Sequence, residues 1–226
     1  MTKKNEISKE AICIFSGLCG GANEPLVRDA VAFFTAKEFD VYIFSYCSSK
    51  NRNLEHLSFA SFLKRFDQQY KRIEKHHPKV HFIGHSFGAL LFVLFMRENI
   101  SKKMGKLIIW DPALFSSMKD WIDNYFNRSD KKTFVEKLAN NPIVFSKILY
   151  DEITSYSEEK SLFNKIEHPA LIIAAEKGAV DNAKRIFSWS NKKTVKLTVI
   201  KDTGHLFGKY KARRELFKKT FNFIKQ

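Results

Sequence analysis

The sequence has no apolar run approaching the roughly 20 residues that a membrane-spanning helix requires. Its first ten residues are polar, and the apolar run that follows covers only residues 11–15. A secretory signal needs about 7–15 apolar residues followed by a cleavage site of small residues, and neither feature is present. We therefore expect a cytoplasmic protein.

Cysteine is scarce: Cys13, Cys19 and Cys47 are odd in number, which favours reduced thiols over a disulfide framework. There is no C-x-x-C pair and no cluster of histidine and cysteine, so the sequence predicts no metal site. Internal repeats and low-complexity linkers are also absent. At 226 residues the chain is long enough for a sizeable core, and we expect a single domain over residues 1–226.

Acidic residues are in the minority, with 24 Asp and Glu against 39 Lys and Arg, for a net charge of +15. The lysines are scattered, which is typical of a solvated surface, and no nucleic-acid recognition motif accompanies them. We expect no specific nucleic-acid partner. The field of such a surface would still attract an anionic substrate, an acidic partner or an anionic membrane, and the sequence does not choose among them or indicate an oligomeric state.

Short apolar runs alternate with amphipathic helical patterns along the chain. Buried strands are expected at 11–15, 41–45, 80–83, 106–110, 170–174 and 195–200, with helices between them such as 59–75, 182–190 and 213–225. This alternation predicts an α/β protein. Its mainly parallel, doubly wound sheet would have about six strands, helices on both faces, and active residues at the carboxyl ends of the strands.

Residues 112–168 interrupt the alternation. They carry at least two helical patches rich in aromatic residues and no convincing strand pattern. We predict a helical cap or lid, inserted over the carboxyl edge of the sheet, whose aromatic residues mainly serve packing.

The stretch Gly84-His85-Ser86-Phe87-Gly88 has an apolar strand pattern before it and an apolar helix pattern after it, which is the context that G-x-S-x-G requires. A serine at such a sharp turn has a strained backbone, and Gly84 and Gly88 remove side chains that would collide with the turn. Ser86 is therefore the predicted nucleophile. The Phe87 N–H stands at a helix N-terminus, where it would stabilise a developing oxyanion.

With these features the chain resembles the α/β-hydrolase family over nearly its whole length, as a trimmed version of about six strands. Thr203-Gly204-His205 is similar to the segment that supplies the catalytic base of that family, which implies that His205 activates Ser86. The stretch Phe15-Ser16-Gly17-Leu18 stands where the family places its oxyanion loop. The resemblance therefore implies an oxyanion hole made by the N–H groups of Leu18 and Phe87.

The sequence does not decide which carboxylate orients the imidazole. After the strand at 170–174, the family pattern read without gaps puts Gly178 where an Asp is usual. Asp181 is the first candidate, although it could instead cap the helix that follows. Asp111, in a stretch similar to the D-P-A of pancreatic-type lipases, is the second candidate. Glu176, or no acid at all, is the remaining alternative.

Two further residues near the predicted site are given structural roles. His85 neighbours Ser86 but is expected to point away from it across the turn. Cys19 lies in the oxyanion loop with no base beside it in the pattern, so we expect it to pack there.

The predicted chemistry is that of a serine hydrolase, which cleaves a carboxylic ester or thioester through an acyl-enzyme on Ser86 and needs no cofactor. The aromatic cap predicts an apolar acyl group. Two alternatives stay open. One is an acyltransferase, peptidase or C–C hydrolase on the same scaffold. The other is a non-catalytic binding or effector module that has kept the serine turn and lost the acid.

Overall fold

The inner strands at the centre of the molecule are apolar along almost their whole length, because helices cover both faces of the sheet. The computed structural model describes residues 9–18, 20–46, 52–98, 101–129, 132–137, 139–156 and 158–226. Cys19 and Cys47 lie outside the described residues, and so does the packing role expected for Cys19. The strands of the central sheet are β1 (Ala11–Phe15), β2 (Asp40–Phe44), β4 (Val80–His85), β5 (Met104–Trp110), β9 (Ala170–Lys177) and β10 (Val195–Gly204).

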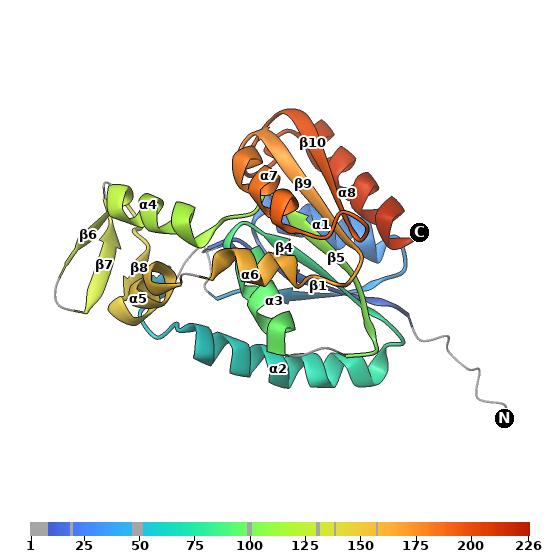
Figure 1. Cartoon of the computed structure of the whole chain (residues 1–226), viewed down its shortest axis with the longest axis horizontal. Helices are drawn as coiled ribbons and strands as arrows, with labels where there is room; N and C mark the ends of the chain where they lie inside the picture. Colours follow the sequence, from blue (N-terminus) through green and yellow to red (C-terminus); the bar gives the residue numbers. More distant parts are fainter. Residues whose placement is uncertain are drawn as a thin grey trace.

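The six strands lie in the order β10-β9-β5-β4-β1-β2, and each neighbouring pair is parallel (Figure 1). The chain proceeds from β1 outward to β2, then crosses to the other side of β1 and continues through β4, β5, β9 and β10. This reversal makes the carboxyl ends of β1 and β4 a topological switch point, where open α/β sheets bind their ligands. The predicted α/β architecture with a six-stranded parallel sheet is confirmed.

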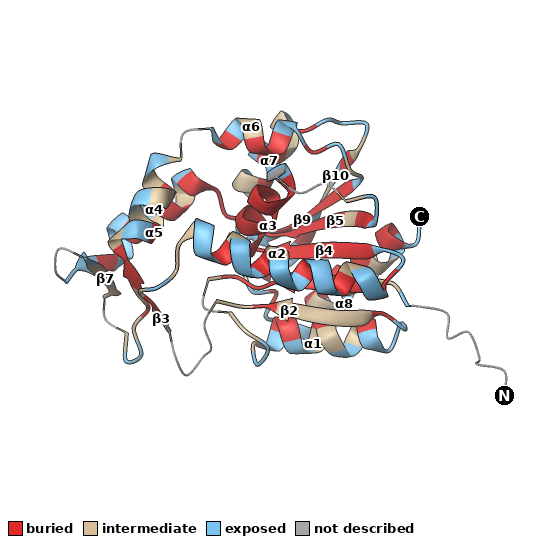
Figure 2. Ribbon diagram, turned by 90° about the horizontal axis from the view of Figure 1, so that it is seen from below, coloured by how far each residue is buried: buried red, intermediate tan, exposed pale blue. Residues whose placement is uncertain are grey.

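Helices cover the two faces of this sheet. On one face lie α1 (Pro25–Thr35) and α8 (Tyr210–Ile224); on the other lie α2 (Phe59–His76), α3 (Phe87–Glu98) and α7 (Val180–Trp189). Successive residues of β1 serve opposite faces, since Ile12 packs with α1 and α8 while Cys13 packs with α2 and α3. Figure 2 shows the buried strands between helices whose outer faces are exposed. No helix in the described part of the chain combines the length and apolarity needed to cross a membrane.

Between β5 and β9 the chain forms the cap. Its elements are α4 (Phe115–Tyr125), β6 (Phe126–Arg128), β7 (Thr133–Glu136), β8 (Val144–Ser146), α5 (Lys147–Ser155) and α6 (Glu159–Asn164). The expectation of a purely helical insertion is wrong, because β6, β7 and β8 form a second sheet with β3 (Asn53–Leu54) in the order β3-β8-β7-β6. In Figure 1 this small sheet lies beside α4 and α5, at one end of the molecule.

The strands of the cap were not predicted because their cause is not local. Each has two to four residues, too few to display a readable alternation of apolar and polar side chains. Their pairing depends on β3, which belongs to the segment before α2, and on side-chain packing across strands. The rings of Phe134 and Phe145, for example, stack on neighbouring strands with their centroids 5.4 Å apart.

Candidate active site

Ser86 lies at the turn between β4 and α3, at the switch point of the sheet. Its φ angle is 54°, in the left-handed region that non-glycine residues rarely adopt. The Ser86 N–H donates a hydrogen bond of 3.0 Å to the carbonyl oxygen of Trp110, which ties the turn to the end of β5. Such strain persists only where surrounding contacts impose it, and it is common at functional sites.

Gly84 and Gly88 make this turn sterically possible. A Cβ at Gly84 would lie 2.6 Å from the Cα of Ala89, and a Cβ at Gly88 would lie 2.4 Å from the carbonyl oxygens of both Phe15 and Ser16. Gly84 thus lets α3 begin directly above β4, whereas Gly88 lets the loop after β1 approach the serine. Both effects agree with the reason for which these glycines were singled out in the sequence.

A hydrogen-bonded chain connects Ser86 with two further side chains. His205, in the turn after β10, has its Nε2 atom 2.9 Å from Ser86 Oγ and its Nδ1 atom 2.6 Å from Asp111 Oδ2. Because a carboxylate only accepts hydrogen bonds, Nδ1 carries the proton, and Nε2 is free to accept the hydroxyl proton of Ser86. The Asp111 side chain is fully buried, while that of His205 is 41% exposed.

Backbone groups hold the carboxylate of Asp111 in place. Its Oδ1 atom accepts a hydrogen bond of 2.8 Å from the Ala175 N–H, and its Oδ2 atom accepts one of 2.9 Å from the Ala179 N–H. The Asp111 N–H in turn donates to the carbonyl oxygen of Ile173 at 2.8 Å. These bonds satisfy a buried anion that would otherwise be costly and fix the direction in which it meets His205.

Asp181, the first candidate for the acid, does not contact His205. It lies in the first turn of α7, its side chain is 89% exposed, and its Oδ1 atom is 3.8 Å from Nζ of Lys184. It does not cap the helix either, because the N-cap position belongs to Ala179. The start of α7 turns Asp181 towards solvent. Since β5 pairs directly with β9, Asp111 reaches the imidazole from the neighbouring strand.

Glu176, the remaining named alternative for the acid, is also directed elsewhere. It is exposed, and its Oε2 atom accepts a hydrogen bond of 2.9 Å from the Asp202 N–H. Of the three carboxylates considered from the sequence, Asp111 is the one that meets the imidazole.

The loop after β1 lies against the serine turn. Its shape is held by a bond of 2.9 Å from the Gly20 N–H to the Gly17 carbonyl, and by a bond of 2.8 Å from Ser16 Oγ to the Gly20 carbonyl. The hydroxyl of Tyr46 also donates to the Ser16 carbonyl. Leu18 lines the cavity beside Ser86, and Phe87 is the first residue of α3. The use of their N–H groups as oxyanion donors stays a prediction.

His85 does not point away from the site, contrary to our expectation. Its ring lies against that of His205, with the centroids 4.9 Å apart, and its Nε2–H donates a hydrogen bond of 3.0 Å to the His205 carbonyl. Burial lowers the pKa of His85 to about 4, and the nearby His205 acts in the same direction. His85 is therefore neutral at neutral pH and holds the backbone of His205. The sequence could not reveal this, because the side to which His85 points depends on the loop after β10.

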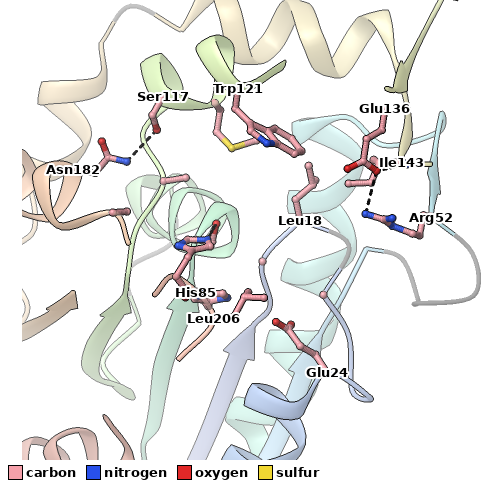
Figure 3. Close-up of a pocket in the computed structure, with 17 residues that line it drawn as sticks. Leu18, Glu24, Arg52, His85, Ser117, Trp121, Glu136, Ile143, Asn182 and Leu206 are labelled. Carbon is pink, nitrogen blue, oxygen red and sulfur yellow. Dashed lines mark hydrogen bonds and ion pairs between the residues drawn. The ribbon is translucent and has the colours of Figure 1, made fainter. Parts of the chain in front are cut away.

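A cavity of about 380 Å³ opens beside Ser86 and His205, between the sheet and the cap (Figure 3). Its apolar lining includes Met118, Trp121, Ile143 and Leu206. Its polar lining includes Glu24, Arg52, Ser117, Glu136 and Asn182.

Most polar side chains of the cavity are paired with one another. Nη2 of Arg52 lies 3.3 Å from Oε2 of Glu136, and Nδ2 of Asn182 donates to Oγ of Ser117 at 3.1 Å. None of these residues was predicted from the sequence, because β3, the cap and α7 bring them together from distant segments. Within the described residues, no group of three or more His, Cys, Asp or Glu is arranged to hold a metal ion.

Comparison with known proteins was made at the levels of sequence and structure. The sequence matches no model of a known protein family and no curated protein. The structure resembles the esterase domain of a Rhodothermus marinus protein, with a TM-score of 0.71 at 13% identity over 96% of this chain and 86% of that one. It also resembles a monoacylglycerol lipase from Paleococcus ferrophilus, with a TM-score of 0.67 at 14% identity over 95% and 93% of the two chains.

A third resemblance is to the alpha/beta hydrolase GrgF from Penicillium sp. sh18, with a TM-score of 0.66 at 9% identity over 97% of this chain and 90% of that one. At such low identities the likeness establishes the fold and not the reaction, because one fold hosts many reactions and substrates. The chain has the α/β-hydrolase fold.

Proposed function

We propose that the protein is a serine hydrolase that cleaves a carboxylic ester or thioester through an acyl-enzyme intermediate on Ser86. The observation that carries this proposal is the continuous hydrogen-bonded chain from Ser86 through His205 to Asp111, which opens into a cavity at the switch point of the sheet. A serine hydroxyl becomes a useful nucleophile at neutral pH when an oriented imidazole can take its proton, and this chain supplies that imidazole.

The reaction follows from these contacts. As Ser86 Oγ attacks the carbonyl carbon, His205 Nε2 accepts the hydroxyl proton, and the carboxylate of Asp111 stabilises the imidazolium. The N–H groups of Leu18 and Phe87 donate hydrogen bonds that stabilise the negative charge developing on the carbonyl oxygen. His205 then protonates the leaving alcohol or thiol. Water, activated by the same imidazole, releases the acid and restores Ser86.

The acyl group that suits this cavity is apolar. Met118, Trp121 and Ile143 line the side of the cavity formed by the cap, and such surfaces favour hydrocarbon chains over acetyl groups. We therefore expect octanoyl esters to be hydrolysed with a higher kcat/KM than acetyl esters. Trp121→Ala would reduce the value for octanoyl esters and leave that for acetyl esters nearly unchanged. A wild-type protein that prefers acetyl esters would refute the assignment of the acyl group.

Covalent labelling with a fluorophosphonate tests the nucleophile, with intact mass as the readout. We expect one adduct on the wild-type protein and none on Ser86→Ala. Ser117→Ala, which alters another serine of the same cavity, is the matched control and should still be labelled. Folded wild-type protein that forms no adduct would contradict the proposal.

The rival functions make different predictions. A binding module without an acid was favoured by Gly178, but Asp111 supplies a carboxylate to His205 from the neighbouring strand. An acyltransferase would pass the acyl group to an added alcohol or amine in preference to water. Product analysis in the presence of such acceptors separates this reaction from hydrolysis.

A further inference from the structure

Glu24 brings a carboxyl group into the cavity from the residue before α1, on the side of the loop that follows β1 (Figure 3). Its side chain makes no capping hydrogen bond to α1. Its Oε2 atom is buried and has no hydrogen-bond partner among the described residues. That oxygen lies against Gly20, where a Cβ would be 2.4 Å away, so the glycine makes room for it.

An acceptor in this condition costs free energy. A buried polar atom that has lost water and gained no partner destabilises the fold by about 1–3 kcal/mol, and more when it is charged. Burial also raises the pKa of Glu24, whereas the nearby His205 opposes that shift. A partly buried carboxyl group without a protein partner, in the same cavity as the predicted nucleophile, is a candidate ligand-binding group.

The donor that would satisfy Glu24 does not come from the cation of the cavity. Arg52 is occupied by Glu136 and by the Asn141 carbonyl, to which its Nη1 donates at 2.6 Å. Figure 3 shows this ion pair apart from Glu24. Because Glu24 lines the cavity, a molecule in the cavity can offer a donor to its carboxyl group through the oxygen that is not buried against Gly20.

The cavity has two chemically different ends. Met118, Trp121 and Ile143 give the cap side an apolar wall, whereas Glu24 gives the loop side an acceptor. We propose that Glu24 binds a hydroxyl group on the alcohol part of the ester, while an apolar acyl chain lies against the cap. This inference rests on the proposed function and names its substrate class, namely apolar acyl esters of an alcohol that retains a free hydroxyl.

A pair of esters that differ in one group tests the inference. 2-Hydroxyethyl octanoate and propyl octanoate differ by a hydroxyl in place of a methyl. A hydrogen bond to a charged acceptor corresponds to about tenfold or more in kcat/KM, which is the preference we expect of the wild-type protein for the hydroxyl ester. Glu24→Leu should abolish this preference, because kcat/KM should fall about tenfold or more further for the hydroxyl ester than for the propyl ester, and Glu24→Gln should retain part of it.

Matched controls separate this role from alternatives. Glu215→Gln changes an exposed carboxylate of α8 that does not line this cavity and should leave the preference unchanged. Replacing an unpaired buried acceptor by Leu should not lower Tm, whereas the loss of a structural contact would. Equal rates for the two esters in the wild-type protein, or an undiminished preference in Glu24→Leu, would overturn the inference. A higher kcat/KM for the choline ester of octanoic acid than for 2-hydroxyethyl octanoate would also overturn it, because Glu24 would then select a cation. So would a higher kcat/KM for ethyl 2-hydroxyoctanoate than for ethyl octanoate, because the hydroxyl would then lie on the acyl side.

Equilibrium binding keeps the test independent of turnover. The Ser86→Ala protein is titrated by calorimetry with 2-(octyloxy)ethanol and with octyl propyl ether, which no esterase cleaves. Tighter binding of the hydroxyl ether, lost on adding Glu24→Leu, would support the acceptor site at Glu24 even if the protein hydrolysed no ester. Equal binding of the two ethers would overturn the site even if ester hydrolysis were demonstrated.

Discussion

The Oδ2 atom of Asp111 occupies the space into which a side chain at position 178 would project, since a Cβ on Gly178 would lie 2.2 Å from that oxygen. Position 178 follows β9, where the carboxylate was expected, and Asp111 follows β5, the neighbouring strand. The two strand ends therefore share one place beside His205 that holds a single carboxylate. The glycine is the structural complement of the aspartate.

Exchanging the acid for its amide tests this assignment. Asp111→Asn should lower kcat by roughly 10³- to 10⁴-fold, because an amide does not hold the imidazole in the required tautomer. Asp181→Asn should leave kcat nearly unchanged, because that side chain is exposed and lies beside Lys184. Ester hydrolysis by both variants, with circular dichroism as the folding check, decides the matter. A large loss in Asp181→Asn alone would reverse the assignment.

A methyl group at position 178 should disable the site. Gly178→Ala would force the carboxylate of Asp111 away from its backbone donors, so we expect a large fall in kcat and a loss of about 1–3 kcal/mol in the free energy of unfolding. Gly208→Ala is the control, because no heavy atom beyond its two chain neighbours lies within 4 Å of a Cβ at that position. Kinetics and urea denaturation of both variants provide the comparison. Full activity in Gly178→Ala would mean that the carboxylate is not confined as described.

The shared place also predicts a rescue. In the double variant Asp111→Gly and Gly178→Asp, the carboxylate returns to His205 from β9 instead of β5. We expect kcat above that of Asp111→Gly alone, although below that of the wild-type protein. No recovery in a folded double variant would show that β9 cannot present a carboxylate in this chain.

Gly88 should control the oxyanion side of the site. In Gly88→Ala the new methyl group would press on the carbonyl oxygens of Phe15 and Ser16 and displace the loop that carries Leu18. The loss of one oxyanion donor costs about 10²–10³ in kcat, and we expect a fall of this size. Turnover is measured at temperatures where the variant remains folded, with Gly208→Ala again as the control. A rate equal to that of the wild-type protein would mean that the Leu18 N–H is not an oxyanion donor.

Two buried histidines should make stability depend on pH. Burial lowers the pKa of both His81 and His85 to about 4, while an unfolded histidine titrates near 6.5. Between these values the unfolded state binds more protons than the folded state. The free energy of unfolding that the two neutral histidines contribute is therefore fully present above about pH 6.5 and is lost as the pH falls towards 4. We expect a loss on the order of 3 kcal/mol for each histidine.

Urea denaturation at several pH values measures this dependence. His81→Asn should reduce it by about half, because the amide oxygen can still accept the bond from the Lys106 N–H and only His85 then contributes. His56→Asn is the control, since His56 is exposed. A wild-type protein equally stable at pH 7 and pH 4.5 would argue against neutral buried histidines.

The serine turn was predictable because its cause is local. A strand, two glycines at fixed spacing and an apolar helix specify the conformation of Ser86 within one short stretch, and the structure has that conformation. The choice of His205 followed from the resemblance of Thr203-Gly204-His205, directly after the last strand, to the family segment that supplies the base. Parallel strands end at one edge of a sheet, which places this histidine at the same edge as the serine, and the turn after β10 then brings its ring past β9 and β5 to Ser86.

The sequence by itself determined the six parallel strands and the serine turn, because periodicity and turn chemistry act between near neighbours in the chain, while the family resemblance of its last turn indicated the histidine. Tertiary structure alone decided the rest: Asp111 in place of Asp181, the inward direction of His85, the strands of the cap and the unpaired carboxyl of Glu24. Each of these depends on which segments, distant in the chain, become neighbours in space. Because β5 pairs with β9, Asp111 at the end of β5 lies beside the imidazole. Because β3 pairs with β8, the segment before α2 becomes part of the small sheet beside the cavity.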